Sequence, residues 1–177
     1  MTLGAPGALC CLAAGTALGS WLRERRLARW RMLRALTEAL GFMRLMLEQE
    51  RPPLPELLNQ SAACMGSGSG CDEVAKRFQR TAEEMVLQPL SGVACAYAKA
   101  CAEIPMPWEQ AEERCAMESL FAQLGSGTAT MREQAAASCL RRLRPLLESA
   151  QTEAKRGGRL CMQLGALLGL MAGIALW

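Results

Sequence analysis

The chain has 177 residues, of which 51% are hydrophobic and only 5% are aromatic, and its formal net charge is +3. So small a charge does not indicate a nucleic-acid-binding protein, whose binding surface is strongly basic. The absence of histidine removes the usual general base near neutral pH and disfavours an enzyme. The nine cysteines contain no CxxC pair, so neither a zinc site nor a redox motif has its usual spacing. We predict no cofactor.

The N-terminal segment is uncharged over residues 3–22, "LGAPGALCCLAAGTALGSWL". As a helix it would approach the thickness of the hydrocarbon core of a bilayer, and we predict that it spans a membrane. Because Pro6 and many small residues lower its hydrophobicity, an interfacial or poorly inserted helix is an alternative. A cleaved signal peptide is disfavoured, since no basic residue precedes the apolar run.

A long helix is predicted to continue this segment from Trp21 to Glu50, where the prolines that follow stop it. Its apolar residues recur at alternating spacings of three and four, as on the buried face of an amphipathic helix. These residues are Leu33, Leu36, Leu40, Met43 and Leu47.

Four shorter helices are predicted next, over Pro55–Met65, over Asp72–Val86, over Ser91–Ile104 with Ser91 as N-cap, and from Pro107 to about residue 124. The paired acidic residues in these helices, Glu83–Glu84 and Glu112–Glu113, are interpreted as solvated helix faces.

The last cytosolic helix is predicted to begin at Thr130, which forms a capping box with Glu133, and to be kinked at Pro145. We expect a hinge or break at Gly157-Gly158. Its inner face is predicted to comprise Met131, Ala135, Cys139, Leu143, Leu146, Ala150 and Ala154.

The C-terminal segment, residues 160–177, "LCMQLGALLGLMAGIALW", is uncharged and contains one polar amide, Gln163. A second membrane span is predicted here, and a buried core helix is the alternative. Basic residues lie on the inner side of both apolar segments, so the positive-inside rule places the middle of the chain in the cytoplasm and both termini across the membrane. The first segment is followed by Arg23, Arg25 and Arg26. The second is preceded by Lys155, Arg156 and Arg159, with Arg141, Arg142 and Arg144 further back.

Glycines recur every fourth residue in both apolar segments, so each set lies on one face of its helix. Such small-residue faces allow membrane helices to approach closely, and we predict that the spans pack through them. The glycines are Gly15 and Gly19 in the first segment and Gly165, Gly169 and Gly173 in the second.

The predicted fold is all-α, an antiparallel bundle of about five to six helices flanked by N- and C-terminal transmembrane helices. The domain boundaries follow from the charge pattern. Residues 1–22 form the first transmembrane helix, 23–157 the cytosolic helical domain and 158–177 the second transmembrane helix.

The chain resembles the stage III sporulation protein AB family over its full length. The segments that carry the resemblance are "RRLARWRMLRALTEALGFM", "RPPLPELL", "MREQ" with the helix that follows, and "GGRLCMQLGALLGLMAGIAL". One departure is that a threonine, Thr128 or Thr130, stands where the family usually has an aspartate before the glutamine.

The resemblance implies a subunit of a complex in the mother-cell membrane that faces the forespore. It also implies a cytosolic domain similar to the F-protein domain of type II secretion and type IV pilus machines, and an ATPase partner, stage III sporulation protein AA. We therefore expect a non-enzymatic platform that contacts this ATPase, other membrane subunits and membrane lipids.

Two alternatives differ in class from the platform. A small oligomeric pore or transporter would need polar residues within the membrane, and only Thr16, Ser20 and Gln163 qualify. A membrane enzyme with a cysteine nucleophile would lack a histidine partner. The flanking arginines have two interpretations, attraction to anionic lipid or a docking surface for acidic patches on the ATPase.

Overall fold

The computed structural model describes the backbone of residues 4–175 apart from 51, 69 and 126, and the side chains of residues 14, 16–155 with the same gaps, and 171. Within this part the chain forms six α-helices and no strand, which confirms the all-α prediction. The helices are α1 (Gly4–Gln49), α2 (Leu54–Ala63), α3 (Cys71–Leu87), α4 (Val93–Glu103), α5 (Ala111–Gly125) and α6 (Ala129–Ala175).

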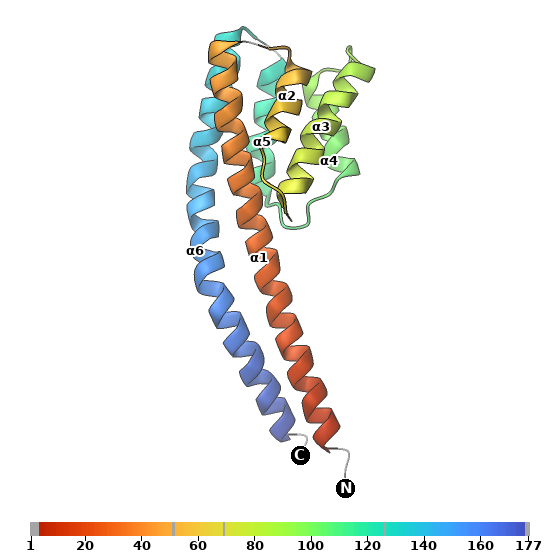
Figure 1. Ribbon diagram of the computed structural model, residues 1–177, viewed down its shortest axis with the longest axis vertical. Coiled ribbons are helices and arrows are strands. Elements are labelled where there is room, and N and C mark those ends of the chain that lie inside the picture. The colour runs from red at the N-terminus through yellow and green to blue at the C-terminus, as the bar shows by residue number, and fades with distance from the viewer. Residues whose placement is uncertain (1–3, 51, 69, 126, 176–177) are drawn as a thin grey trace. The chain divides into compact units, whose positions relative to one another are not determined.

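The chain divides into two compact units. The terminal unit comprises Met1–Ala28 and Ser149–Trp177, and the central unit comprises Arg29–Glu148. Both α1 and α6 cross from one unit into the other as unbroken helices. In the central unit the parts of α1 and α6 lie side by side, with α2–α5 next to them (Figure 1).

The long helix predicted from Trp21 to Glu50 is confirmed as part of α1, and all five residues of its apolar stripe are at most 3% exposed. The predicted inner face of α6 is buried at Ala135, Cys139 and Leu143, whereas Met131 is exposed. The backbone of α6 stays helical through Pro145 and through Gly157-Gly158, so the break expected at the glycines is wrong. Glycine weakens a helix interior without preventing helix formation.

Helices α2 to α5 pack as sequential neighbours, α2 on α3, α3 on α4 and α4 on α5. Three aromatic rings join the last three of these helices. The rings of Tyr97 and Phe121 stack at 3.9 Å between centroids, and Phe78 meets Phe121 edge-on at 5.8 Å. Such ring pairs add to the stabilisation that burial of their area gives.

Two predicted caps are wrong. Ser91 is not the N-cap of α4, because Gly92, with a φ of +76°, takes that position, while the Ser91 hydroxyl donates to the Gln88 carbonyl. Thr130 does not cap α6 either. The helix begins one residue earlier, and the Thr130 hydroxyl is hydrogen-bonded to that of Thr128.

Helix α5 begins later than predicted, at Ala111, because Pro107 and Trp108 form a turn closed by the hydrogen bond from the Glu109 amide to the Met106 carbonyl. The backbone N–H of Gln110 donates to the Glu113 carboxylate at 2.9 Å. This bond satisfies one of the backbone N–H groups at the start of α5 that have no partner within the helix.

Among the described residues, no helix has a stretch long and apolar enough to cross a membrane. Most of the two predicted spans, residues 3–22 and 160–177, lies outside the residues whose side chains are described.

Candidate interaction surface

The glycines predicted to mediate helix packing fall mainly outside the part of the chain with described side chains. Gly19 is described and is buried in the terminal unit. The surroundings of Gly15, Gly165, Gly169 and Gly173 lie outside the described residues, so their packing role remains a prediction.

The basic residues after the first apolar segment lie on the surface of the terminal unit. Arg23 and Arg25 are exposed, and Arg26 is half-buried. The Arg25 guanidinium lies 5.6 Å from the centroid of the Trp21 ring, a cation–π contact that orients it along α1.

The basic residues of α6 are divided between two faces of the helix. Arg141 and Arg144 line an open groove, whereas Arg142 lines a separate shallow depression with Ser119 and Gln123 of α5. Residues three apart share a helix face, and the residue next to Arg141 is turned by about 100°. The sequence-based grouping of all three arginines in one surface is therefore not what the structure shows.

The groove lies within the central unit, where α1 and α6 are neighbours, and has a volume of about 360 Å³. Its third arginine, Arg44, comes from α1 and was not identified from the sequence. Gln134, Ala137 and Leu140 of α6 complete the lining. The groove therefore combines guanidinium groups from two helices with a short apolar strip.

The charge of the groove is only partly compensated. Arg44 lies 3.8 Å from the Glu133 carboxylate. Within the described part of the chain, neither Arg141 nor Arg144 has a carboxylate at ion-pair distance. The two arginines can therefore bind an external carboxylate without losing an internal partner.

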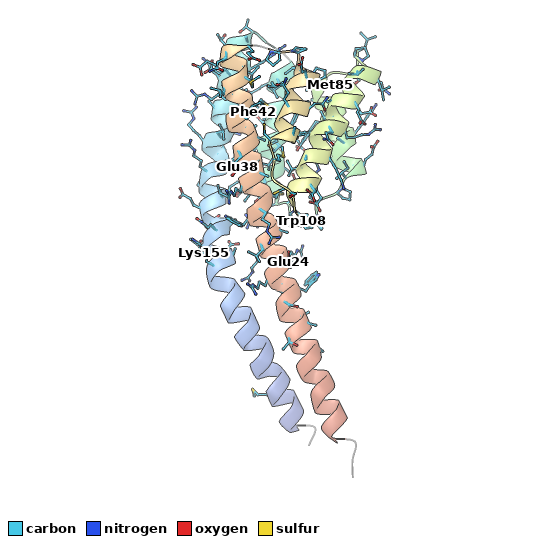
Figure 2. The ribbon with its side chains drawn as sticks, viewed as in Figure 1. Glu24, Glu38, Phe42, Met85, Trp108 and Lys155 are labelled. Atoms are coloured by element: carbon cyan, nitrogen blue, oxygen red, sulfur yellow. The ribbon has the colours of Figure 1, made fainter. Side chains whose placement is uncertain are left out.

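A different set of charges is buried and fixes the connection between α4 and α5. Arg77 on α3 pairs with Glu109 at 2.9 Å, and its Nε donates to the Ile104 carbonyl at 2.8 Å. Arg29 on α1 pairs with Glu113 at 2.8 Å and donates to the Gln110 side chain. The connection that these pairs hold contains Trp108 (Figure 2).

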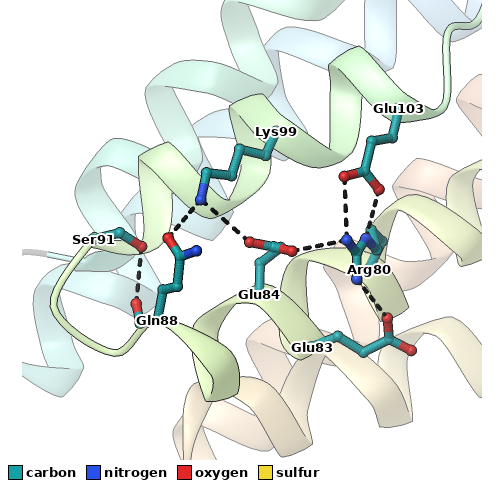
Figure 3. Close-up of polar contacts among 7 residues, drawn as sticks. All are labelled: Arg80, Glu83, Glu84, Gln88, Ser91, Lys99 and Glu103. Carbon is teal, nitrogen blue, oxygen red and sulfur yellow. Dashed lines mark hydrogen bonds and ion pairs between the residues drawn. The ribbon is translucent and has the colours of Figure 1, made fainter.

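These contacts correct the prediction for one member of each acidic pair, since Glu83 and Glu112 are exposed as predicted. Glu113 is 0% exposed and Glu84 is 7% exposed, so neither lies on a solvated face. Glu84 belongs to a cluster between α3 and α4, where it meets Arg80 at 2.9 Å and Lys99 at 3.4 Å (Figure 3). Arg80 also binds both oxygens of Glu103, at 2.6 and 3.2 Å, and so links the two helices.

The described cysteines are free thiols, and three of them are held in the protonated form by burial. Burial raises the pKa of Cys71 and Cys101, and it raises the pKa of Cys139 to about 11. A thiol with a raised pKa is a poor nucleophile at neutral pH. No group of three or more Cys, Asp or Glu among the described residues is placed to hold a metal ion.

The fold and surface together define a class, an all-helical domain whose first and last helices run on toward two apolar chain ends. More specifically, the chain belongs to the stage III sporulation protein AB family, whose sequence model matches residues 5–177. This confirms the family resemblance and gives the chain a role in sporulation, as a subunit of the sporulation complex. The family is not a known enzyme family. No curated protein and no solved structure matches the chain significantly.

Proposed function

We propose that the chain is a non-enzymatic membrane platform subunit of the sporulation complex that links mother cell and forespore. In this proposal the central unit docks a secretion-type ATPase, stage III sporulation protein AA, on its cytoplasmic surface. The apolar ends hold the unit in the mother-cell membrane beside other membrane subunits, with both termini outside the cytoplasm.

The continuity of α1 and α6 carries this proposal. Each helix has one part in the central unit and continues without a break into an apolar segment of the chain, α1 toward its N-terminal end and α6 toward its C-terminal end. A partner that binds the central unit is thereby joined to both apolar ends through helical backbone. A platform needs this kind of link between a cytosolic partner and a membrane complex.

The arrangement of charge supports the orientation. Arg23 and Arg25 are exposed directly after the first apolar segment, and Lys155 is exposed shortly before the second. Basic residues on the inner side of both segments favour a cytoplasmic central unit. They also favour contact with anionic lipid headgroups.

An affinity pull-down tests the platform. The tagged full-length chain is solubilised in detergent from membranes of sporulating cells, with a tagged unrelated membrane protein as control, and co-purified proteins are identified by mass spectrometry. We expect recovery of a secretion-type ATPase together with other membrane subunits. Recovery of the chain alone as a homo-oligomer would contradict the platform and favour a pore.

Cysteine labelling tests the orientation independently. Cys64, Cys95 and Cys115 are exposed on the central unit, and Cys139 is buried there. A membrane-impermeant maleimide should label the three exposed thiols only after the membrane is permeabilised, and Cys139 only after unfolding. Labelling of these three in intact cells would contradict a cytoplasmic central unit.

A further inference from the structure

We infer that the groove between α1 and α6, lined by Arg44, Arg141 and Arg144, is a docking site for an acidic segment of a partner protein that also carries a small apolar side chain. The inference rests on the proposed function in one respect, which is that the partner belongs to the same complex. The groove itself is argued from the contacts and charges of the central unit.

The lining determines the chemistry of the occupant. Three guanidinium groups stand on two helices, and no carboxylate is among the residues that line the groove within the described chain. Guanidinium binds carboxylate through paired, directional hydrogen bonds. Between the arginines lie the half-buried Ala137 and Leu140, which offer a short apolar contact. An acidic segment with one apolar residue satisfies both features.

The position of the arginines favours a peptide segment over a free small molecule as the occupant of the groove. The groove is open along one side, whereas small-molecule sites bury most of the ligand surface. Arg141 and Arg144 are three residues apart on one helix, and Arg44 faces the groove from the other helix. Several carboxylates from one chain can therefore engage both walls together.

The charge around the groove favours a protein over a lipid surface. Glu133 pairs with Arg44, and Glu48 and Glu148 are exposed one helical turn from Arg44 and Arg144. A bilayer responds to the summed charge of the surface, which is mixed here. An acidic segment in the groove instead contacts the three guanidinium groups directly.

The structure also provides a matched control. Arg142 has the same charge and is also exposed, but it lines the depression on the α5 side of α6. Reversal of its charge changes the net charge of the domain as much as Arg141→Glu does. The two variants therefore separate an effect of the groove from an effect of overall charge.

Site-specific photo-crosslinking tests the inference. A benzophenone amino acid replaces Ala137 in the full-length chain in sporulating cells, and the adduct is identified by mass spectrometry after irradiation. We expect a peptide rich in Asp and Glu from a partner protein. The yield of the crosslinked adduct should fall about tenfold in each of three variants, Arg44→Glu, the milder Arg44→Gln, and Arg141→Glu, since a charged hydrogen bond is lost. Arg142→Glu should leave the yield within about twofold, because Arg142 lies outside the groove.

Each outcome separates this inference from the proposed function. An acidic peptide from the ATPase supports both, and an acidic peptide from another protein supports the groove while removing the ATPase from it. A lipid adduct, a peptide without acidic residues or no adduct overturns the inference. An equal loss of yield in Arg142→Glu and Arg141→Glu overturns it as well, whatever the pull-down recovers.

Discussion

The Arg77 guanidinium lies 2.9 Å from the Glu109 carboxylate, and the two side chains are 2% and 1% exposed. Arg77 is on α3, and Glu109 belongs to the turn before α5. A charge pair so completely removed from water is tolerated only when both charges are satisfied. The pair therefore ties the α4–α5 connection to α3.

Removing one member of this pair should destabilise the domain strongly. Arg77→Met leaves Glu109 buried without its main partner, and we expect the free energy of unfolding to fall by about 3–5 kcal/mol. Urea denaturation of the full-length chain, followed by circular dichroism, measures this change. Arg114→Gln is the control, because Arg114 is 53% exposed and lies 3.6 Å from the same carboxylate. That variant should change stability by no more than about 0.5 kcal/mol.

A double variant distinguishes loss of the pair from loss of packing. Arg77→Met combined with Glu109→Leu replaces both charges by apolar groups and leaves neither unpaired. We expect it to be more stable than Arg77→Met alone, because burial of an isolated charge is the main cost. Equal or lower stability of the double variant would show that the unpaired Glu109 carboxylate is not the main cost of Arg77→Met. The cost would then lie in what both variants lose, the packing of Arg77 and its hydrogen bond to the Ile104 carbonyl.

The thiol of Cys139 should make the domain less stable at alkaline pH. Burial raises its pKa from 9.0 to about 11, so the folded state retains the proton where the unfolded state releases it. The stabilisation is therefore complete below about pH 9 and is lost as the pH rises through about 11. Urea denaturation at several pH values under reducing conditions should show this fall, and Cys139→Ala should reduce its slope. Cys64→Ala, which removes an exposed thiol, should leave the slope unchanged.

The Arg80–Glu103 pair should control the titration of Glu103. The hydrogen bonds from Arg80 hold the pKa of this carboxyl below its usual value of 4.5. The pair therefore stabilises the domain above the pKa of the unfolded chain, and its contribution is lost as the pH falls through the lowered value. NMR titration of Arg80→Ala should show the pKa of Glu103 rising toward its usual value. Arg34→Ala, which removes the Arg34–Glu38 pair on α1, should leave the titration of Glu103 unchanged.

Local patterns predicted the elements of this fold well. The 3,4 spacing of apolar residues from Leu33 to Leu47 identified the buried face of α1. Residues with this spacing lie on one side of a helix, and that side leaves water when it packs against other helices. Helix ends were less predictable. Ser91 and Thr130 have the chemistry of N-caps, but the residues that directly precede the two helices are Gly92 and Thr128.

Contacts between distant residues could not be predicted from one sequence. Glu113 has the same local setting as Glu112, yet only Glu113 meets Arg29, which comes from another helix. The separation of Arg142 from Arg141 could have been inferred from helix geometry, which turns adjacent residues by about 100°. The contribution of Arg44 to the groove depends on how α1 packs beside α6, and no pattern within α1 indicates it.

The glycine repeat of the C-terminal segment gives a test of assembly. If Gly165, Gly169 and Gly173 form a packing face, Gly169→Leu should push the neighbouring helix away and reduce the recovery of other membrane subunits in the pull-down. The matched control is Gly41→Leu in α1, because Gly41 is exposed and a Cβ added there would meet no atom within 4 Å. That variant should assemble as the unmodified chain does. Unchanged recovery of the membrane subunits with Gly169→Leu would show that the repeat only reflects the frequency of glycine in apolar helices.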